Sequence, residues 1–223
     1  AFTNVDQAEK EEESAFKINT EGLQNLIDFA ENKNISIIHF STDYVFDGQS
    51  SKPYLEKGIT NPLGVYAKSK VQGEILLSKS RCKNVTIRTS WLFSPFGKNF
   101  VKTIARIAKE KLELKVVDDQ WGRPTYGIDL AKIVLKLISS DTLEKFPILH
   151  YANKGMCNWK EFAEAIVNEL KYKTTIQGIP TSTYPTLAKR PNFSILDTER
   201  IEKKLQIEVP AWQESLKKCI QII

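Results

Sequence analysis

The sequence predicts an α/β fold, in which helices alternate with the parallel strands of a sheet. Short apolar runs recur between longer segments whose apolar residues are three and four apart, and these segments are long enough to form the crossovers that parallel strands require. After Ala152 the pattern changes to helices and proline-bearing loops. We therefore predict a parallel sheet combined with a smaller, mostly helical unit.

The first part of the chain contains two predicted pairs of a helix and a strand. Apolar residues of helical spacing predict a helix over residues 7–31, and the run ISIIHF at residues 35–40 predicts a short buried strand. A second helix is predicted over residues 61–79, because Pro62 suits a helix start. The run VTIRTS at residues 85–90 predicts the second strand.

Two further pairs follow in the same order. Helices are predicted over residues 100–111 and 128–139, and strands over residues 114–117 and 148–152.

Beyond Ala152 three helices and a loop are predicted. Asn158 is a plausible N-cap for a helix with one apolar face, made by Trp159, Phe162, Ala163, Ile166, Val167 and Leu170. A proline-bearing loop at residues 178–191 follows. Two short helices then close the sequence, one opened by Asp197 and the other with Pro210 in its first turn.

Composition excludes several classes of protein. The 223 residues are 41% apolar, yet no run approaches the roughly 18 consecutive apolar residues of a membrane helix. The three cysteines are too scattered for a disulfide framework or a zinc site, and His39 and His150 lie inside strand-like runs, as satisfied structural histidines do. The net charge of +5 is diffuse, with no nucleic-acid-binding motif. We expect a cytoplasmic protein with neither a membrane nor a nucleic-acid partner.

The stretch GVYAKSK could carry chemistry. It places Tyr66 and Lys70 four residues apart in a predicted helix, so that they share one face. A neighbouring ammonium lowers the pKa of a phenol and makes the tyrosine a usable general acid or base. The motif alone is weak, because a packed tyrosine beside a solvated lysine gives the same spacing.

The strand at residues 35–40 runs directly into STDYVFDG. This places Thr42 and Asp43 at the carboxyl end of a parallel strand, where α/β sheets bind ligands. Thr42 could hydrogen-bond to a substrate oxygen or to Tyr66, although hydroxyls at a strand end also satisfy backbone groups.

These motifs, taken together, resemble the dTDP-4-dehydrorhamnose reductase family, whose members are extended short-chain dehydrogenases/reductases. The matching segments occur in order along nearly the whole chain: STDYVFDG, Pro53-Tyr-x-Glu56, Thr60-Asn-Pro62, Tyr66-x-x-x-Lys70, Gly73-Glu74, Arg88-Thr-Ser-Trp91, Asn99-Phe100, Asp118-Asp-Gln-x-Gly-x-Pro-Thr125, Pro180-Thr-x-x-Tyr-Pro-Thr186, Arg190-Pro191 and Leu196-Asp197.

The resemblance implies a Rossmann-like parallel sheet and a mostly helical substrate-binding domain. Residues 1–96 and 126–152 would form the cofactor and catalytic domain, and residues 97–125 and 153–223 the substrate-binding domain. It also implies reduction of the C4 ketone of dTDP-4-dehydro-L-rhamnose to dTDP-L-rhamnose by NADPH or NADH, a step of cell-surface polysaccharide biosynthesis. A homodimer is left open.

The family's roles carry over to individual residues of this chain. Tyr66 would protonate the developing alkoxide, Lys70 would lower the tyrosine pKa and bind the nicotinamide ribose, and Thr42 would hydrogen-bond at the reacting oxygen. The other implied contacts fall in two groups: Ala1, Phe2 and Thr3 with the cofactor, and Asp43, Trp91, Arg123 and Arg190 with the sugar nucleotide.

The sequence departs from the family's pattern in four places. Ala67 replaces a frequent glycine, and Arg190-Pro-Asn-Phe-Ser194 leaves a role of Asn192 in doubt. Ile128 stands where some members have a metal-linked glutamate, so we predict no metal. None of the ten glycines forms a phosphate-binding G-x-G-x-x-G or G-x-x-G-x-x-G, and the chain opens near the family's Ala-x-Thr-x-Val-Asp segment. We therefore expect the glycine-rich N-terminal segment to be missing and the 223-residue chain to be inactive without it.

Two alternatives compete with this interpretation. One is a noncatalytic relative that acts as a regulatory or binding subunit. Such a protein would not require Thr42, Tyr66 and Lys70 for chemistry, so their presence argues against this alternative. The other is an epimerase or dehydratase of the same fold, which usually needs further acid and base groups beside the threonine; Asp43-Tyr44 offers only one candidate.

Overall fold

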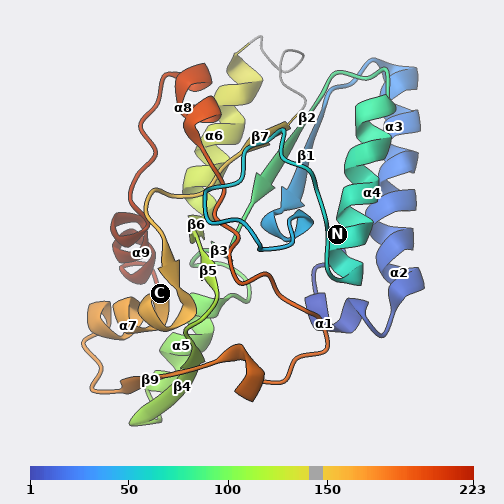
Figure 1. Cartoon of the computed structure of the whole chain (residues 1–223). Coiled ribbons are helices and arrows are strands. Elements are labelled where there is room, and N and C mark those ends of the chain that lie inside the picture. The colour runs from blue at the N-terminus through green and yellow to red at the C-terminus, as the bar shows by residue number, and fades with distance from the viewer. Residues whose placement is uncertain (141–147) are drawn as a thin grey trace.

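A three-stranded parallel sheet forms the framework of the structure (Figure 1), a computed structural model that describes residues 1–140 and 148–223. The strands are β1 (Ile37–Thr42), β2 (Asn84–Thr89) and β7 (Ile148–His150), with β2 in the middle. The predicted α/β fold with a parallel sheet is confirmed. Residues 141–147, within the predicted 126–152 segment, lie outside the described residues.

Helices cover both faces of this sheet (Figure 1). Helices α3 (Gly22–Lys33) and α4 (Val65–Lys79) lie on one face, where a buried apolar cluster joins them to β1. Helices α6 (Gly127–Ser139) and α8 (Glu199–Leu205) pack on the other face against apolar residues of β2 and β7. The carboxyl ends of β1 and β2 are level, because Thr42 pairs with Thr89.

The predicted helix over residues 7–31 is interrupted. The structure has α1 (Val5–Ala8), α2 (Glu12–Phe16), a π-helical segment η1 (Lys17–Glu21) and then α3. The backbone of Glu11 is not helical, with φ −125° and ψ 52°, and it separates α1 from α2. The apolar period continues across this break, so the sequence pattern could not reveal it.

Helix α4 begins three residues later than its proline suggested. Gly64 is extended, and Val65 starts the helix. The backbone N–H of Val65 donates to the Glu9 carboxylate over 2.8 Å, so a charge from α1 satisfies a donor that the helix itself leaves unpaired.

A second apolar core lies at the other end of the molecule, around α5 (Phe100–Ala108), α7 (Trp159–Glu169) and α9 (Trp212–Ile220). Here β4 (Glu113–Val117) pairs in parallel with β9 (Thr175–Ile179), a strand that the sequence analysis missed because Gly178 suggested a loop. Asn158 caps α7 as predicted, in a capping box with Glu161. Pro210 lies before the cap of α9 rather than in its first turn.

Two short strand pairs connect the two cores. They are β3 (Leu92–Phe93) with β6 (Thr125–Tyr126), and β5 (Trp121–Gly122) with β8 (Cys157–Asn158). Two 3-10 turns complete the described elements, η2 (Asp43–Val45) after β1 and η3 (Thr181–Thr183) after β9. Within the described residues, no helix is both long and apolar enough to cross a membrane.

Candidate active site

The carboxyl end of β1 carries the first group of candidate residues. Thr42 is 6% exposed and Asp43 is 3% exposed. The Thr42 hydroxyl donates a hydrogen bond to Oδ1 of Asp43 over 3.1 Å and accepts one from the backbone N–H of Tyr44. Thr42 is thus the N-cap of η2, and these two hydrogen bonds hold its side chain at the carboxyl edge of the sheet.

Asp43 is a buried carboxyl group with spare hydrogen-bonding capacity. Burial raises its pKa to about 7, while hydrogen bonds from Ser194 and Thr42 act in the opposite direction. Among the described residues, its Oδ2 atom has no hydrogen-bond partner. A buried oxygen of this kind can accept a hydrogen bond from a ligand hydroxyl.

Tyr66 lies in the first turn of α4, beside a small cavity of about 10 Å³ that Tyr44, Lys189 and Pro191 also line. Burial raises the pKa of Tyr66 to about 12, whereas hydrogen bonding to the Thr42 side chain lowers it. The phenol is therefore protonated at neutral pH and adjacent to Thr42.

Lys70 follows one turn later and is only 4% exposed. Its ammonium nitrogen lies 3.2 Å from Nε2 of His39 on β1. Burial lowers the pKa of Lys70 to about 8, although Glu74 raises it. Desolvation of the phenol and the nearby Asp43 raise the pKa of Tyr66, and the hydrogen bond with Thr42 lowers it; Lys70 is not among these causes.

The segment of Ala1, Phe2 and Thr3 lies against the same helical turn. Asn19 makes two hydrogen bonds to the backbone of Phe2, over 2.8 and 3.0 Å, and a third to the Ser69 hydroxyl over 2.9 Å. Ser69 adjoins Lys70, so Asn19 connects the start of the chain to the turn that separates Tyr66 from Lys70.

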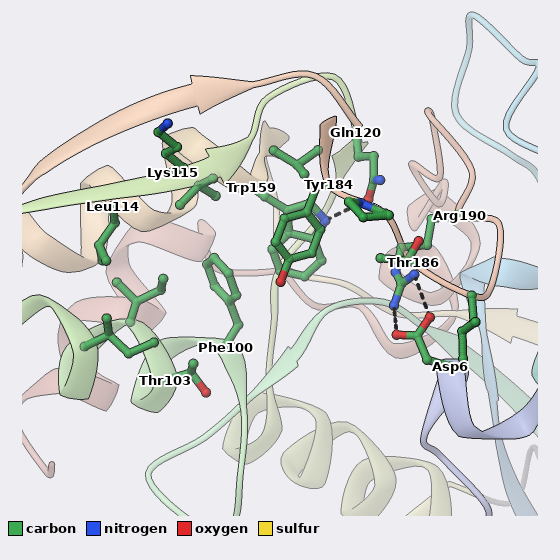
Figure 2. Close-up of a pocket in the computed structure, with 16 residues that line it drawn as sticks. Asp6, Phe100, Thr103, Leu114, Lys115, Gln120, Trp159, Tyr184, Thr186 and Arg190 are labelled. Atoms are coloured by element: carbon green, nitrogen blue, oxygen red, sulfur yellow. Dashed lines mark hydrogen bonds and ion pairs between the residues drawn. The ribbon is translucent and has the colours of Figure 1, made fainter. Parts of the chain in front are cut away.

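A large cavity of about 570 Å³ lies between the second core and the loop after β9 (Figure 2). Its wall includes three aromatic residues, Phe100, Trp159 and Tyr184. The indole N–H of Trp159 donates to Gln120 over 3.2 Å. Cavities of this size and aromatic character suit an organic ligand with a ring system.

An ion pair closes one end of the cavity, as Figure 2 shows. The Arg190 guanidinium contacts both carboxylate oxygens of Asp6, over 2.6 and 3.2 Å, and holds the pKa of Asp6 below its usual value. Asp6 and Arg190 line the large cavity, whereas their neighbours Val5, Lys189 and Pro191 line the small cavity at Tyr66. Arg190 therefore lies between residues that line the two cavities.

Trp91 supports the cavity wall from behind. Its backbone has φ 46°, in the left-handed region, and its ring stacks on Trp159 with centroids 3.5 Å apart. Gly122 lies against the indole, and a Cβ atom there would overlap the ring. Trp91 is not among the residues that line the large cavity.

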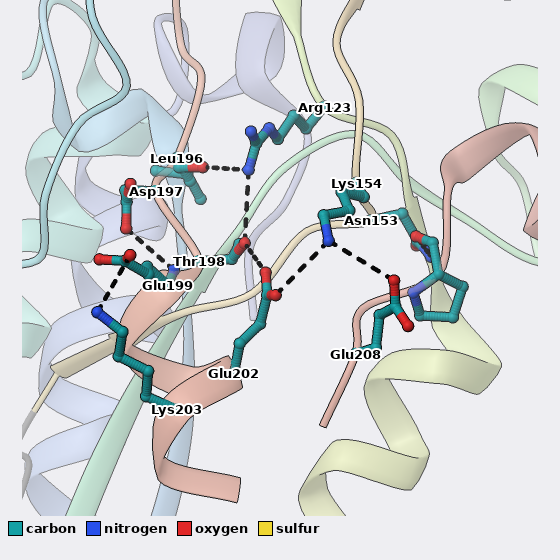
Figure 3. Close-up of polar contacts among 11 residues, drawn as sticks. Arg123, Asn153, Lys154, Leu196, Asp197, Thr198, Glu199, Glu202, Lys203 and Glu208 are labelled. Carbon is teal, nitrogen blue, oxygen red and sulfur yellow. Dashed lines mark hydrogen bonds and ion pairs between the residues drawn. The ribbon is translucent and has the colours of Figure 1, made fainter. Parts of the chain in front are cut away.

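Arg123 lies outside the large cavity and faces the segment before α8 (Figure 3). Its guanidinium donates to the carbonyl of Leu196 over 2.9 Å and to the Thr198 hydroxyl over 3.5 Å, and Thr198 in turn donates to Glu202. Burial lowers the pKa of Arg123. In this structure the arginine joins the loop after β5 to α8.

The sequence analysis did not single out several residues of the site. Asp6, Gln120, Tyr184 and Thr186 stood inside the motifs of the resemblance without an assigned role, and Trp159 was assigned to an apolar helix face. The described residues contain no cluster of three or more histidine, cysteine or acidic side chains able to hold a metal ion.

Comparison with known proteins agrees with this geometry. The family model for the RmlD substrate binding domain matches residues 1–223. A dTDP-4-dehydrorhamnose reductase of Aggregatibacter actinomycetemcomitans is 43% identical, over 97% of this chain and 77% of that protein. The spore coat polysaccharide biosynthesis protein SpsK of Bacillus subtilis is 40% identical, over 99% of this chain and 76% of that protein.

Solved structures give the same result. The crystal structure of a dTDP-4-dehydrorhamnose reductase from Bacillus anthracis in complex with NADP superposes with a TM-score of 0.95 at 35% identity, covering 100% of this chain and 78% of that one. The parallel sheet, with a tyrosine and a lysine one turn apart beside its carboxyl edge, defines a short-chain dehydrogenase/reductase. Within that class, the chain belongs to the dTDP-4-dehydrorhamnose reductase family.

Proposed function

We propose that the protein uses NAD(P)H to reduce the C4 ketone of dTDP-4-dehydro-L-rhamnose to dTDP-L-rhamnose, in nucleotide-sugar and cell-surface polysaccharide biosynthesis. The observation that carries this proposal is the position of Tyr66 next to Thr42 at the carboxyl edge of the sheet. The identity of 43% with a reductase of this specificity supports the choice of substrate.

The residues of this chain fit a nicotinamide cofactor. The Lys70 ammonium has three N–H donors and His39 accepts one of them, which leaves two donors for ribose hydroxyls. Ala1, Phe2 and Thr3 would lie along the cofactor on the same side of α4. When bound, the cofactor supplies a hydride to C4 of the sugar.

Tyr66 and Thr42 act on the oxygen at C4. As that oxygen gains negative charge, the Tyr66 phenol donates its proton to it, and the Thr42 hydroxyl turns from Asp43 Oδ1 to donate a hydrogen bond to it. An alkoxide is a stronger base than a phenolate, so this transfer is favourable even though burial raises the pKa of Tyr66 to about 12. Asp43, the next residue after Thr42, would help to hold the sugar.

The large cavity would hold the nucleotide part of the substrate. Thymine fits the aromatic wall formed by Phe100, Trp159 and Tyr184. The diphosphate would lie near Arg190, between this wall and Tyr66, because a guanidinium pairs well with phosphate oxygens. Direct substrate contacts of Trp91 and Arg123 stay predictions.

The two alternative functions make different predictions. A noncatalytic relative would bind the sugar nucleotide without turnover, and an epimerase would return an isomer without net oxidation of the cofactor. Incubating the natural full-length protein with NADPH and dTDP-4-dehydro-L-rhamnose tests all three. We expect NADPH oxidation that matches formation of dTDP-L-rhamnose, and binding without turnover would refute the proposal.

The domain division and the cellular location follow from the same reasoning. We infer that residues 1–96 and 126–152 form the catalytic domain and that residues 97–125 and 153–223 form the substrate domain. Most of the buried cluster around Ile104 and Phe162 comes from the second set, although Phe93 and Tyr126 join it. Ile201 and Val209 of the second set pack instead with the sheet. Free thiols at Cys82, Cys157 and Cys219 fit a reducing cytoplasm. Whether two copies associate stays a prediction.

Replacing Arg190 with alanine should raise the KM for the sugar nucleotide by about 10- to 100-fold. This is the change in affinity expected when a phosphate loses its hydrogen bonds from a charged guanidinium. Steady-state kinetics with varied substrate measures this. Asp6→Asn is the matched control, since it weakens the same ion pair but keeps the guanidinium. If both variants raise the KM equally, Arg190 serves only to hold α1 against the loop.

A further inference from the structure

We propose that His39 is a positioning residue for Lys70: its neutral imidazole accepts a hydrogen bond from the ammonium and holds the ammonium in place for the nicotinamide ribose. The proposal rests on the proposed function and names a residue that neither the motifs nor the family resemblance assigned. Its test includes a measurement that does not depend on turnover.

The contact joins two elements that also carry the reacting groups. His39 lies on β1, three residues before Thr42, and Lys70 lies on α4, four residues after Tyr66. The Nζ and Nε2 atoms are 3.2 Å apart. The histidine thus connects the strand that positions Thr42 to the helix that positions Tyr66.

The direction of the hydrogen bond follows from the donor inventory. An ammonium has no acceptor atom, so Nε2 of His39 must accept, and the ring proton must lie on Nδ1. Burial and the nearby Lys70 charge lower the pKa of His39 to about 3, so the ring is neutral throughout the working pH range. His39 is thus hydrogen-bonded, as expected of a structural histidine, and the proposal adds a role in positioning Lys70.

A neutral acceptor has an advantage over a carboxylate at this position. A carboxylate would neutralise the ammonium, whereas imidazole holds it and leaves its full positive charge available to the ribose hydroxyls. Glu74 is the nearest carboxylate on α4, but it is engaged with Arg88 through three contacts of 2.6 to 3.2 Å.

Other titratable groups around this contact come from neighbouring elements. Glu74 on α4 raises the pKa of Lys70. Asp43 on η2 acts on Tyr66. Gly73 allows α4 to pack closely on η1, because a Cβ atom there would lie only 2.9 Å from the carbonyl of Asn19. The same Cβ atom would be in ordinary contact with Nε2 of His39, at 3.9 Å.

The test replaces His39 with leucine, which has no acceptor, and with glutamine, whose amide oxygen can accept. In the cofactor-free full-length protein, the Lys70 resonance in ¹⁵N-lysine spectra, assigned with Lys70→Met, reports its titration. We expect His39→Leu to lower the Lys70 pKa by about one pH unit or more, because the charged form loses its hydrogen bond in a buried site. His39→Gln should restore most of it.

Cofactor binding should show the same change. The pH at which NADPH affinity, measured by fluorescence, falls to half should move downward in His39→Leu, because Lys70 loses its proton earlier. Ile37→Ala is the matched control: it weakens packing on the same face of β1 without touching Lys70. The proposal is wrong if His39→Leu only lowers thermal stability, as Ile37→Ala does, or if His39→Gln behaves like His39→Leu.

Discussion

Replacing Tyr66 with phenylalanine should lower kcat by about 10²- to 10⁴-fold, the usual value of a general acid. The ring remains in place against the apolar cluster of Ala8, Ala15 and Val65, so the fold should persist. The oxygen at C4 then lacks its proton donor, while Lys70 still binds the ribose. Single-turnover reduction with the full-length protein, monitored by NADPH absorbance, measures the loss at the chemical step.

The pattern of the loss matters more than its size. Cofactor and substrate dissociation constants should change little, because the phenol hydroxyl acts mainly in the transition state. Tyr172→Phe, which removes the same hydroxyl at the edge of the second core, serves as the control. Full activity in Tyr66→Phe would mean that another group donates the proton, and Asp43 would be the next candidate.

The order and type of most elements could be predicted, because their signals are local. The cap of α7 is an example: Asn158 and Glu161 make the capping box with residues three apart in sequence. The start of α4 could not be found in this way, since its capping group is Glu9, which no local pattern connects to Val65. The pairing of β4 with β9 was missed for the same reason, because the two strands are far apart in the chain.

The candidate site shows the same division. Tyr66, Lys70 and Thr42 belong to short motifs, so the sequence alone could nominate them, and it also nominated Arg190. It could not reveal that Arg190 pairs with Asp6, because the two residues meet across nearly the whole chain. The role of His39 was missed because its partner depends on the packing of α4 against β1, which residue type alone does not report.

Replacing Glu74 with alanine should destabilise the protein by about 3–5 kcal/mol, the typical result of leaving a buried charge unpaired. Glu74 and Arg88 are 6% and 3% exposed in their side chains and are joined at 2.6 Å. Arg88 also contacts the backbone carbonyl of Glu56 at 3.2 Å, Nε2 of His150 at 3.5 Å and the ring of Phe46 at 5.2 Å, and none of these groups carries a negative charge to compensate it. Thermal unfolding should show a fall in Tm of roughly 6–20 °C.

An exposed pair provides the contrast. Glu199 and Lys203 on α8 are 70% and 72% exposed, so Glu199→Ala should change stability by at most about 0.5 kcal/mol. The double variant Glu74→Leu with Arg88→Met should recover much of the loss, because it removes both charges together. Equal losses in Glu74→Ala and Glu199→Ala would contradict the assignment. A large loss that the double variant rescues would identify the unpaired charge of Arg88, buried between α4 and β2, as its cause.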